Sequence, residues 1–157
     1  MKVVVQRCLD ANVSVDGNVV GSIDKGVMLL VGFTKGDSIN EINYMVDKVI
    51  NLRIFDDDEG VMNRSLIDVS GSVLSISQFT LYADARKGRR PSYINALGGE
   101  DAINLYKLFN DALRAELAKF SSDSRVEEGV FGADMKVNFI NDGPVTIILE
   151  KEGNNNG

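Results

Sequence analysis

The chain has 157 residues, a hydrophobic content of 44% and a formal net charge of −6, which suits one compact domain with a hydrophobic core. The negative charge argues against nonspecific binding of nucleic acid by the whole surface. The sequence contains no histidine and one cysteine, Cys8, which excludes an internal disulfide and a metal site of the Cys/His type. We expect Cys8 to be a small core residue.

Hydropathy indicates a cytoplasmic protein. The longest apolar runs, such as VMLLVGF at residues 27–33, are far too short to cross a bilayer. No segment that combines basic and apolar residues, as a signal peptide does, stands at the N-terminus, so we expect no contact with a membrane.

The first half of the chain predicts a β-hairpin, a further strand and a helix. Residues 2–23 form the hairpin, because apolar runs flank the turn signal Asp16-Gly17. Residues 26–33 predict a third strand, and a helix follows behind a cap at Asn40. A second helix lies later in the chain. The apolar positions at helical spacing are Ile42, Met45, Val46, Val49 and Ile50 in the first helix, and Leu105, Phe109, Ala112, Leu113, Leu117 and Phe120 in the second.

Three more strands complete the predicted elements. Residues 73–82 predict a strand between the helices, and residues 135–141 and 145–150 predict two closing strands joined across Asp142-Gly143-Pro144. Two helices are too few to cover both faces of a large sheet. We therefore expect an α/β fold of the α+β type, in which a mixed, barrel-like β layer carries the helices on one side. Residues 1–152 would form a single domain, with a disordered tail at residues 153–157.

The predicted strand at residues 73–82 contains polar side chains where apolar ones are expected. Strand alternation places Gln78 and Thr80 in the same row as Leu74 and Ile76. Burying an amide or a hydroxyl without a partner costs about 1–3 kcal/mol. These side chains therefore have partners within the protein or contact a molecule that enters from outside.

Three charged features each allow two interpretations. Four of the five residues from Arg86 to Arg90 are basic, which fits a solvated turn or a site for phosphate groups. The acidic residues 56–60 fit a solvated turn or a cation site, but they lack the periodicity of a calcium loop, and we predict no metal. Arg7 alternates with apolar residues, so its five donors need carbonyl or carboxylate acceptors, as in a core ion pair.

Two motifs point to a known family. The segments Ser77-Gln78-Phe79-Thr80 and Asn141-Asp142-Gly143-Pro144-Val145-Thr146 strongly resemble the signatures of the D-aminoacyl-tRNA deacylases, also called D-tyrosyl-tRNA deacylases. The likeness extends to VVQR, ANVSVDG, EGVMNRS, KGRRPSY and FGADMKV, in the order of the family. Tyr93 stands where a phenylalanine is more usual, Cys8 replaces a common β-branched residue, and the Asn-rich tail lies beyond the usual end.

The resemblance implies a homodimeric, three-layer β/β/α hydrolase that cleaves the ester between a D-amino acid and the terminal adenosine of tRNA, without a cofactor. Because this ester is already activated, oxyanion donors and a water molecule are sufficient, and no histidine is needed. The family reading assigns the oxyanion site to the backbone around Phe79 and Thr80, with Ser77 and Gln78 shaping it. The 2′-hydroxyl of the adenosine would assist the attack. A rival reading makes Thr80 the nucleophile, although the sequence supplies no adjacent base for it.

The resemblance also implies the remaining site residues. Phe131 and Met135 match positions that line an adenine pocket, where an aromatic ring and a thioether suit stacking on a base; core packing is the alternative. Gly143 and Pro144, joined by a cis bond and assisted by Arg7 and Asn141, would form a chirality filter that reaches into the active site of the partner subunit. Lys87 and Arg90 would contact phosphates near the acceptor end of the tRNA.

The sequence also allows a function without catalysis. The same pocket would also suit a catalytically silent module that binds an RNA end or a small carboxylate ligand. The intact motifs favour the enzyme. Whether glycyl-tRNA is also a substrate, and which D-amino acids matter, is left open at this stage.

Overall fold

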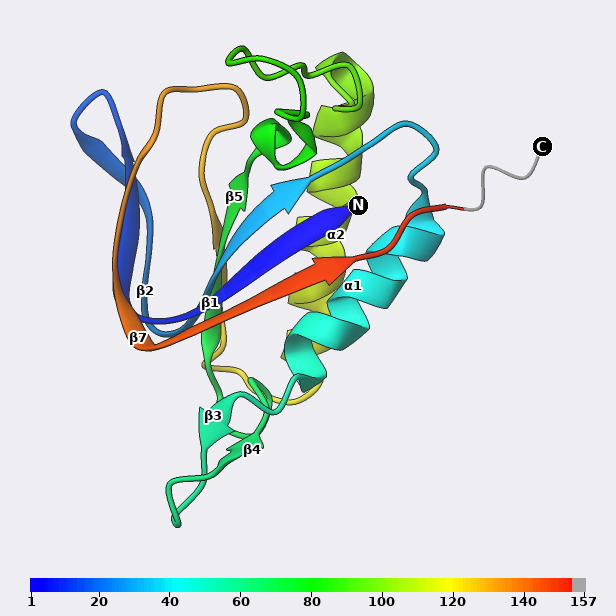
Figure 1. Ribbon diagram of the computed structural model, residues 1–157. Helices are drawn as coiled ribbons and strands as arrows, with labels where there is room; N and C mark the ends of the chain where they lie inside the picture. The colour runs from blue at the N-terminus through cyan, green and yellow to red at the C-terminus, as the bar shows by residue number, and fades with distance from the viewer. Residues whose placement is uncertain (154–157) are drawn as a thin grey trace.

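The computed structural model describes residues 1–153, which form a five-stranded mixed sheet with the strand order β6-β5-β2-β1-β7 (Figure 1). The strands β1, β2 and β7 pair antiparallel, whereas β5 pairs parallel to β2, and β6 parallel to β5. A separate two-stranded sheet pairs β3 with β4. The strand bounds are β1 Lys2–Val15, β2 Asn18–Gly32, β3 Phe55–Asp56, β4 Met62–Arg64, β5 Ser72–Ser77, β6 Val126–Glu128 and β7 Lys136–Glu150.

The predicted hairpin is confirmed. Asp16 and Gly17, between β1 and β2, have φ values of 51° and 81°, as a two-residue turn that follows the strand twist requires. The separate third strand at residues 26–33 is wrong, because β2 continues through this segment without a break. Gly26 lies where β5 joins the sheet, and a Cβ atom there would overlap the carbonyl oxygen of Ser72. The absence of a side chain therefore allows β5 to pair closely with β2.

Both predicted helices are present, and they cover the same face of the sheet (Figure 1). They are α1, Ile39–Asn51, and α2, Gly99–Ala118. The cap of α1 is Ser38, and the prediction of Asn40 is wrong. The Ser38 hydroxyl accepts a hydrogen bond from the Asn40 N–H, while the Glu41 carboxylate accepts one from the Ser38 N–H at 2.7 Å, which completes a capping box.

The strand predicted for residues 73–82 ends early. β5 stops at Ser77, and the 3₁₀ helix η1, Phe79–Tyr82, follows. The Gln78 N–H donates to the carbonyl oxygen of Val31 at 2.7 Å, after which the chain turns away from β2. Gln78 and Thr80 therefore do not continue an apolar row, and the alternation that placed them there ends with the strand.

The two closing strands predicted for residues 135–141 and 145–150 are one strand, β7, which is interrupted by a bulge. In its ladder with β1, Gln6 pairs with Thr146 and Cys8 pairs with Asn141. Arg7 alone therefore faces the four residues 142–145. A bulge of this kind bends the strand and changes the direction of the residues within it.

The apolar residues form two cores, as a β/β/α arrangement requires. One lies between the sheet and the helices and includes Val5, Leu29, Met45 and Phe109. The other includes Cys8, as predicted for this residue, together with Met28 and Leu74, and partly buried residues of β7 such as Phe139 pack against it. Figure 1 shows that the long strands β1, β2 and β7 are curved. The predicted tail lies outside the described residues, except for Gly153.

The acidic segment at residues 56–60 forms a turn between β3 and β4. The Asp57 carboxylate accepts hydrogen bonds from the N–H groups of Glu59 and Val61 at 2.9 and 3.0 Å, and these bonds lower the pKa of the carboxyl group. No cluster of three or more potential metal ligands occurs within residues 1–153.

Candidate active site

A pocket of about 300 Å³ lies where β2 and β5 end and η1 begins, and the segment between β6 and β7 closes its other side. Five of the residues expected in the site line this pocket, namely Ser77, Gln78, Phe79, Phe131 and Met135. The first three of these residues precede the last two by more than 50 positions in the chain. A larger cavity of about 500 Å³, at the other end of η1, contains none of the motif residues.

The backbone at the start of η1 has unused donors. Within the described chain, the N–H groups of Phe79 and Thr80 make no backbone hydrogen bond, as expected for the first residues of a helix. The Thr80 side chain is exposed, and its hydroxyl accepts a short hydrogen bond from the Gln78 amide. Within residues 1–153, no ionisable side chain is hydrogen-bonded to this hydroxyl. In the described part of the chain, Thr80 is thus not hydrogen-bonded to a general base.

The wall formed by Phe131 and Met135 depends on residues that the sequence reasoning missed. The ring of Phe131 packs against Tyr106 of α2, with 5.9 Å between the ring centroids. The Tyr106 hydroxyl donates to the carbonyl oxygen of Ser75 at 2.7 Å, which links this wall to β5. A Cβ atom on Gly129 would overlap the Met135 sulfur atom. Tyr106 was detectable only as one more apolar position of the second helix.

Arg7 holds the bulge of β7 from the interior. Its side chain is nearly buried, and its Nε donates to the Asp142 carbonyl oxygen at 3.1 Å. Its Nη1 donates to the Ile54 carbonyl oxygen at 2.9 Å. Ion pairs to the carboxylates of Asp56 and Asp142, both at 3.3 Å, complete its contacts. Carbonyl and carboxylate acceptors, the two kinds that the sequence required, are thus both present.

Gly143 and Pro144 lie at the tip of the bulge and are joined by a cis peptide bond. Gly143 has a φ of 126°, and a Cβ atom there would lie 2.8 Å from Val145 Cγ2 and 3.1 Å from Arg7 Nη2. A side chain at this position is therefore excluded by conformation and by space. Neither residue lines the 300 Å³ pocket, and neither do Arg7 and Asn141. Within one chain, these four residues are therefore not part of the pocket that Ser77 and Gln78 line.

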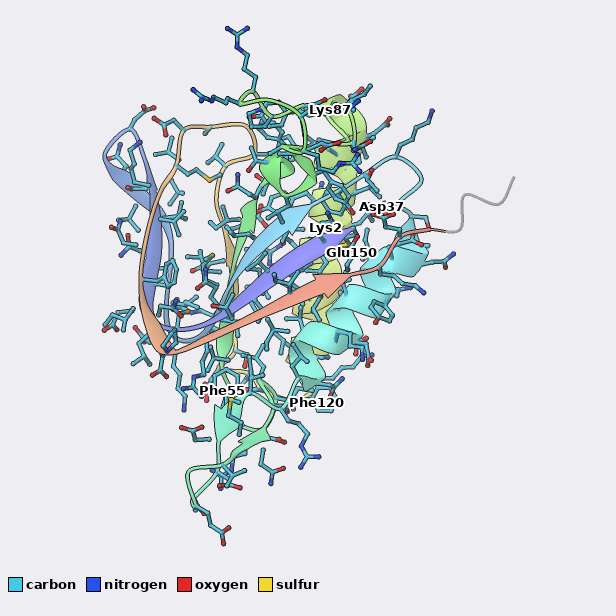
Figure 2. The ribbon with its side chains drawn as sticks, viewed as in Figure 1. Lys2, Asp37, Phe55, Lys87, Phe120 and Glu150 are labelled. Atoms are coloured by element: carbon cyan, nitrogen blue, oxygen red, sulfur yellow. The ribbon has the colours of Figure 1, made fainter. Side chains whose placement is uncertain are left out.

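The basic residues 86–90 form an exposed loop that is closed by a bridge between Asp84 and Ser92. Arg86 makes two bonds to the Asp84 carboxylate, at 2.7 and 2.9 Å, which lower the pKa of this carboxyl group to about 2. Within residues 1–153, no ion pair involves the other cations of the loop, Lys87, Arg89 and Arg90. Figure 2 shows Lys87 at the top of the view, away from the sheet.

The fold places the chain among known structures. It matches a structure named "c-Myc DNA Unwinding Element Binding Protein" with a TM-score of 0.88 and 37% identity, over 98% of this chain and 100% of that one. A structure described as a "probable eukaryotic D-amino acid tRNA deacylase" has a TM-score of 0.80 over 94% of this chain and 97% of that one. Its 19% identity shows a shared fold only.

The sequence comparisons identify the family. The model of the D-Tyr-tRNA(Tyr) deacylase family matches residues 4–150, so the chain belongs to this family, as its motifs predicted. A protein named D-aminoacyl-tRNA deacylase from Clostridium botulinum strain Eklund 17B is 53% identical over 98% of this chain and 99% of the relative. A protein of the same name from strain Alaska E43 is 52% identical over the same shares. In the part of the chain that the structure describes, no helix is long and apolar enough to span a membrane.

Proposed function

We propose that this chain hydrolyses the ester bond between a D-amino acid and the terminal adenosine of tRNA, releasing the free amino acid and the tRNA. One observation carries this proposal. Phe79, whose backbone N–H is unused, borders the same pocket as the wall of Phe131 and Met135, and the unused N–H of Thr80 follows directly in the chain. Family membership and the names of relatives that are 50–53% identical support the same substrate.

The chemistry requires little from side chains. The oxygen of a water molecule attacks the ester carbonyl, negative charge develops on the carbonyl oxygen, and the free N–H groups of Phe79 and Thr80 stabilise this charge. The carbon–oxygen bond to the ribose then breaks, and a proton passes to the departing ribose oxygen. The adjacent 2′-hydroxyl of the substrate can assist these proton transfers. Thr80 would position the substrate, because within residues 1–153 no base is hydrogen-bonded to its hydroxyl to convert it into a nucleophile.

The pocket would hold the terminal adenosine. Its volume of about 300 Å³ is at the lower end of the range for small-molecule sites, which is about 300–1,000 Å³. The Phe131 ring and the Met135 thioether offer a flat aromatic surface and a polarisable one to the adenine base. The side chains of Ser77 and Gln78 would then lie near the ester, at the mouth of the pocket.

Selection by handedness would come from the backbone of the bulge. Carbonyl groups around Gly143 and Pro144 can obstruct the space into which every L side chain points, whichever amino acid is attached. Arg7 supports this role, because it holds the Asp142 carbonyl oxygen in a fixed direction. Glycine has no side chain, so this filter would admit glycyl-tRNA.

A homodimer would bring the filter to the catalytic residues. The Gly143-Pro144 tip lies outside the pocket of its own chain, so it would serve the pocket of the partner subunit. β7 is an edge strand of the sheet, and its residues Ile140 and Ile148 are 53% and 72% exposed. An exposed edge with apolar side chains is a surface on which a second copy can dock. Outside the pocket, Lys87 and Arg90 would contact phosphates of the acceptor end.

Multiple turnover separates the enzyme from a catalytically silent binding module. Purified protein is incubated with a hundredfold excess of D-Tyr-tRNA, and the charged tRNA that remains is counted over time. The proposal requires loss of many equivalents of ester per protein. A protein that retains D-Tyr-tRNA on a filter but leaves its ester intact would be a binding module, and the deacylase proposal would be wrong.

A further inference from the structure

Two exposed aromatic rings stand beside the pocket. Phe79 and Tyr93 pack edge to face, with ring centroids 5.2 Å apart and an interplanar angle of 67°. Their exposed fractions are 53% and 46%, so neither ring belongs to a core. We propose that this pair, called here the aromatic step, stacks the base of the nucleotide that precedes the terminal adenosine. The inference rests on the proposed function, because it continues the RNA from the adenosine pocket.

The aromatic step is continuous with the pocket. Phe79 lines the pocket itself, and so does Leu97, which follows Tyr93 by four residues. A nucleic acid strand that leaves the pocket over this rim therefore meets the exposed face of the two rings first. Ile94, which follows Tyr93 in the chain, is 86% exposed. Single exposed apolar residues are common, but adjacent aromatic rings at the rim of a pocket indicate a binding surface.

The segment that carries Tyr93 is held firmly. The Leu97 N–H donates to the carbonyl oxygen of Phe33 at 2.9 Å, and the Thr34 hydroxyl donates to the carbonyl oxygen of Asn95 at 2.5 Å. Before Tyr93, Ser92 exchanges two backbone hydrogen bonds with Asp84, at 2.7 and 2.8 Å. The ring is thus presented on an ordered backbone that is anchored to the end of β2.

The positive charge beside the aromatic step favours RNA as its ligand. The loop that leads into Tyr93 carries Lys87, Arg89 and Arg90, which have no ion pair within residues 1–153. The protein as a whole has a net charge of −6, so these cations make a local exception. Single-stranded nucleic acids bind where aromatic side chains stack the bases and nearby cations neutralise the backbone, with little dependence on base identity. The step and the loop satisfy both requirements.

Two stable ligands test the inference. The first is an adenosine that carries D-tyrosine through an amide in place of the ester. The second is the same compound extended by one preceding cytidine nucleotide. The wild-type protein should bind the dinucleotide more tightly. Tyr93→Ala should weaken dinucleotide binding by roughly 5- to 150-fold, the range expected for one stacked base, and change nucleoside binding by less than about twofold. Tyr93→Phe should retain the affinity for both ligands.

Tyr44→Ala is the matched control, because Tyr44 is an exposed tyrosine on α1, 38% accessible and away from the pocket. A second readout needs no variant. The fluorescence of 2-aminopurine at the preceding position should be quenched when the dinucleotide binds to the wild-type protein. The inference is overturned if the dinucleotide binds no more tightly than the nucleoside, or if Tyr93→Ala weakens both ligands equally. Either result leaves the turnover of D-Tyr-tRNA, which tests the proposed function, unaffected.

Discussion

Replacing Arg7 with alanine should loosen the β7 bulge and weaken the rejection of L-amino acids before it unfolds the protein. The side chain donates to two backbone carbonyl oxygens, those of Ile54 and Asp142, and forms ion pairs with two carboxylates. Its removal leaves the Asp142 carbonyl without the donor that directs it. In the proposed filter, the residues of the bulge can then rotate away from the space assigned to an L side chain.

The expected loss of stability follows from these contacts. Each hydrogen bond from a charged donor contributes about 1.5–3 kcal/mol, so the two carbonyl contacts contribute about 3–6 kcal/mol. The partner carboxylates of Asp56 and Asp142 are 53% and 42% exposed, so their ion pairs add little. Release of the buried guanidinium from its desolvation offsets part of the total. We expect a loss of about 3 kcal/mol, or about 6–12 °C in Tm for a chain of this size.

The assay measures folding and selectivity on the same samples. Thermal unfolding followed by circular dichroism gives the change in Tm, and deacylation of D-Ala-tRNA and L-Ala-tRNA gives the discrimination. Arg125→Ala is the control, because Arg125 also contacts one carbonyl oxygen (Ser22) and one carboxylate (Glu127). It lies beside β6, at the edge of the sheet opposite β7. An Arg7→Ala protein that stays folded, hydrolyses D-Ala-tRNA at the normal rate and remains inert toward L-Ala-tRNA would refute the anchoring role.

Three further predictions concern other residues. Thr80→Ala should slow hydrolysis only partly if Thr80 positions the substrate, as measured by single-turnover rates; complete loss, or a trapped acyl-Thr80, would contradict this. Replacing Lys87 and Arg90 with serine should lower the slope of log Kd for tRNA against log salt by about 1–2. Arg86→Ser, which removes a cation already paired with Asp84, should change that slope less. Burial raises the pKa of the Cys8 thiol to about 12, so iodoacetamide at pH 8 should label the unfolded protein only, and labelling of the folded protein would count against this burial.

Local chemistry explains why some elements were predictable. The hairpin follows from the flanking apolar runs together with Asp16 and Gly17, both of which adopt the positive φ that the turn requires. The helices follow from their apolar spacing. The cap of α1 was assigned to Asn40, although Ser38 followed three residues later by Glu41 is a capping-box pattern that distinguishes the two. This signal was present in the sequence and would have corrected the boundary.

Contacts between distant residues explain the elements that could not be predicted. Alternation in residues 73–82 continues past Ser77, but the pairing of β5 with β2 ends at the hydrogen bond from Gln78 to Val31, which is 47 positions earlier, and η1 begins at the next residue. The bulge in β7 likewise depends on the register with β1, where Arg7 faces four residues. Neither partner can be found from the local pattern alone.

The candidate site divides in the same way. The motif residues at 77–80 were identified by resemblance, and the structure brings Ser77, Gln78 and Phe79 to one pocket with Phe131 and Met135. Tyr106, which links the pocket wall to β5, could not be identified from the sequence, because its hydrogen bond to the Ser75 carbonyl oxygen spans 31 positions. The motifs mark the residues that we propose contact the substrate, whereas the residues that support them carry only the ordinary pattern of a core.

The handedness of the attached amino acid provides the most direct test of the whole account. Four substrates are prepared on the same tRNA acceptor end, carrying D-Ala, L-Ala, D-Tyr or L-Tyr, and the rate of ester loss is measured for each under single-turnover conditions. A filter made of backbone carbonyls predicts rapid loss of both D-esters and survival of both L-esters, regardless of side-chain size. Hydrolysis that follows the identity of the amino acid, with D-Tyr and L-Tyr lost together and both alanine esters intact, would contradict the account.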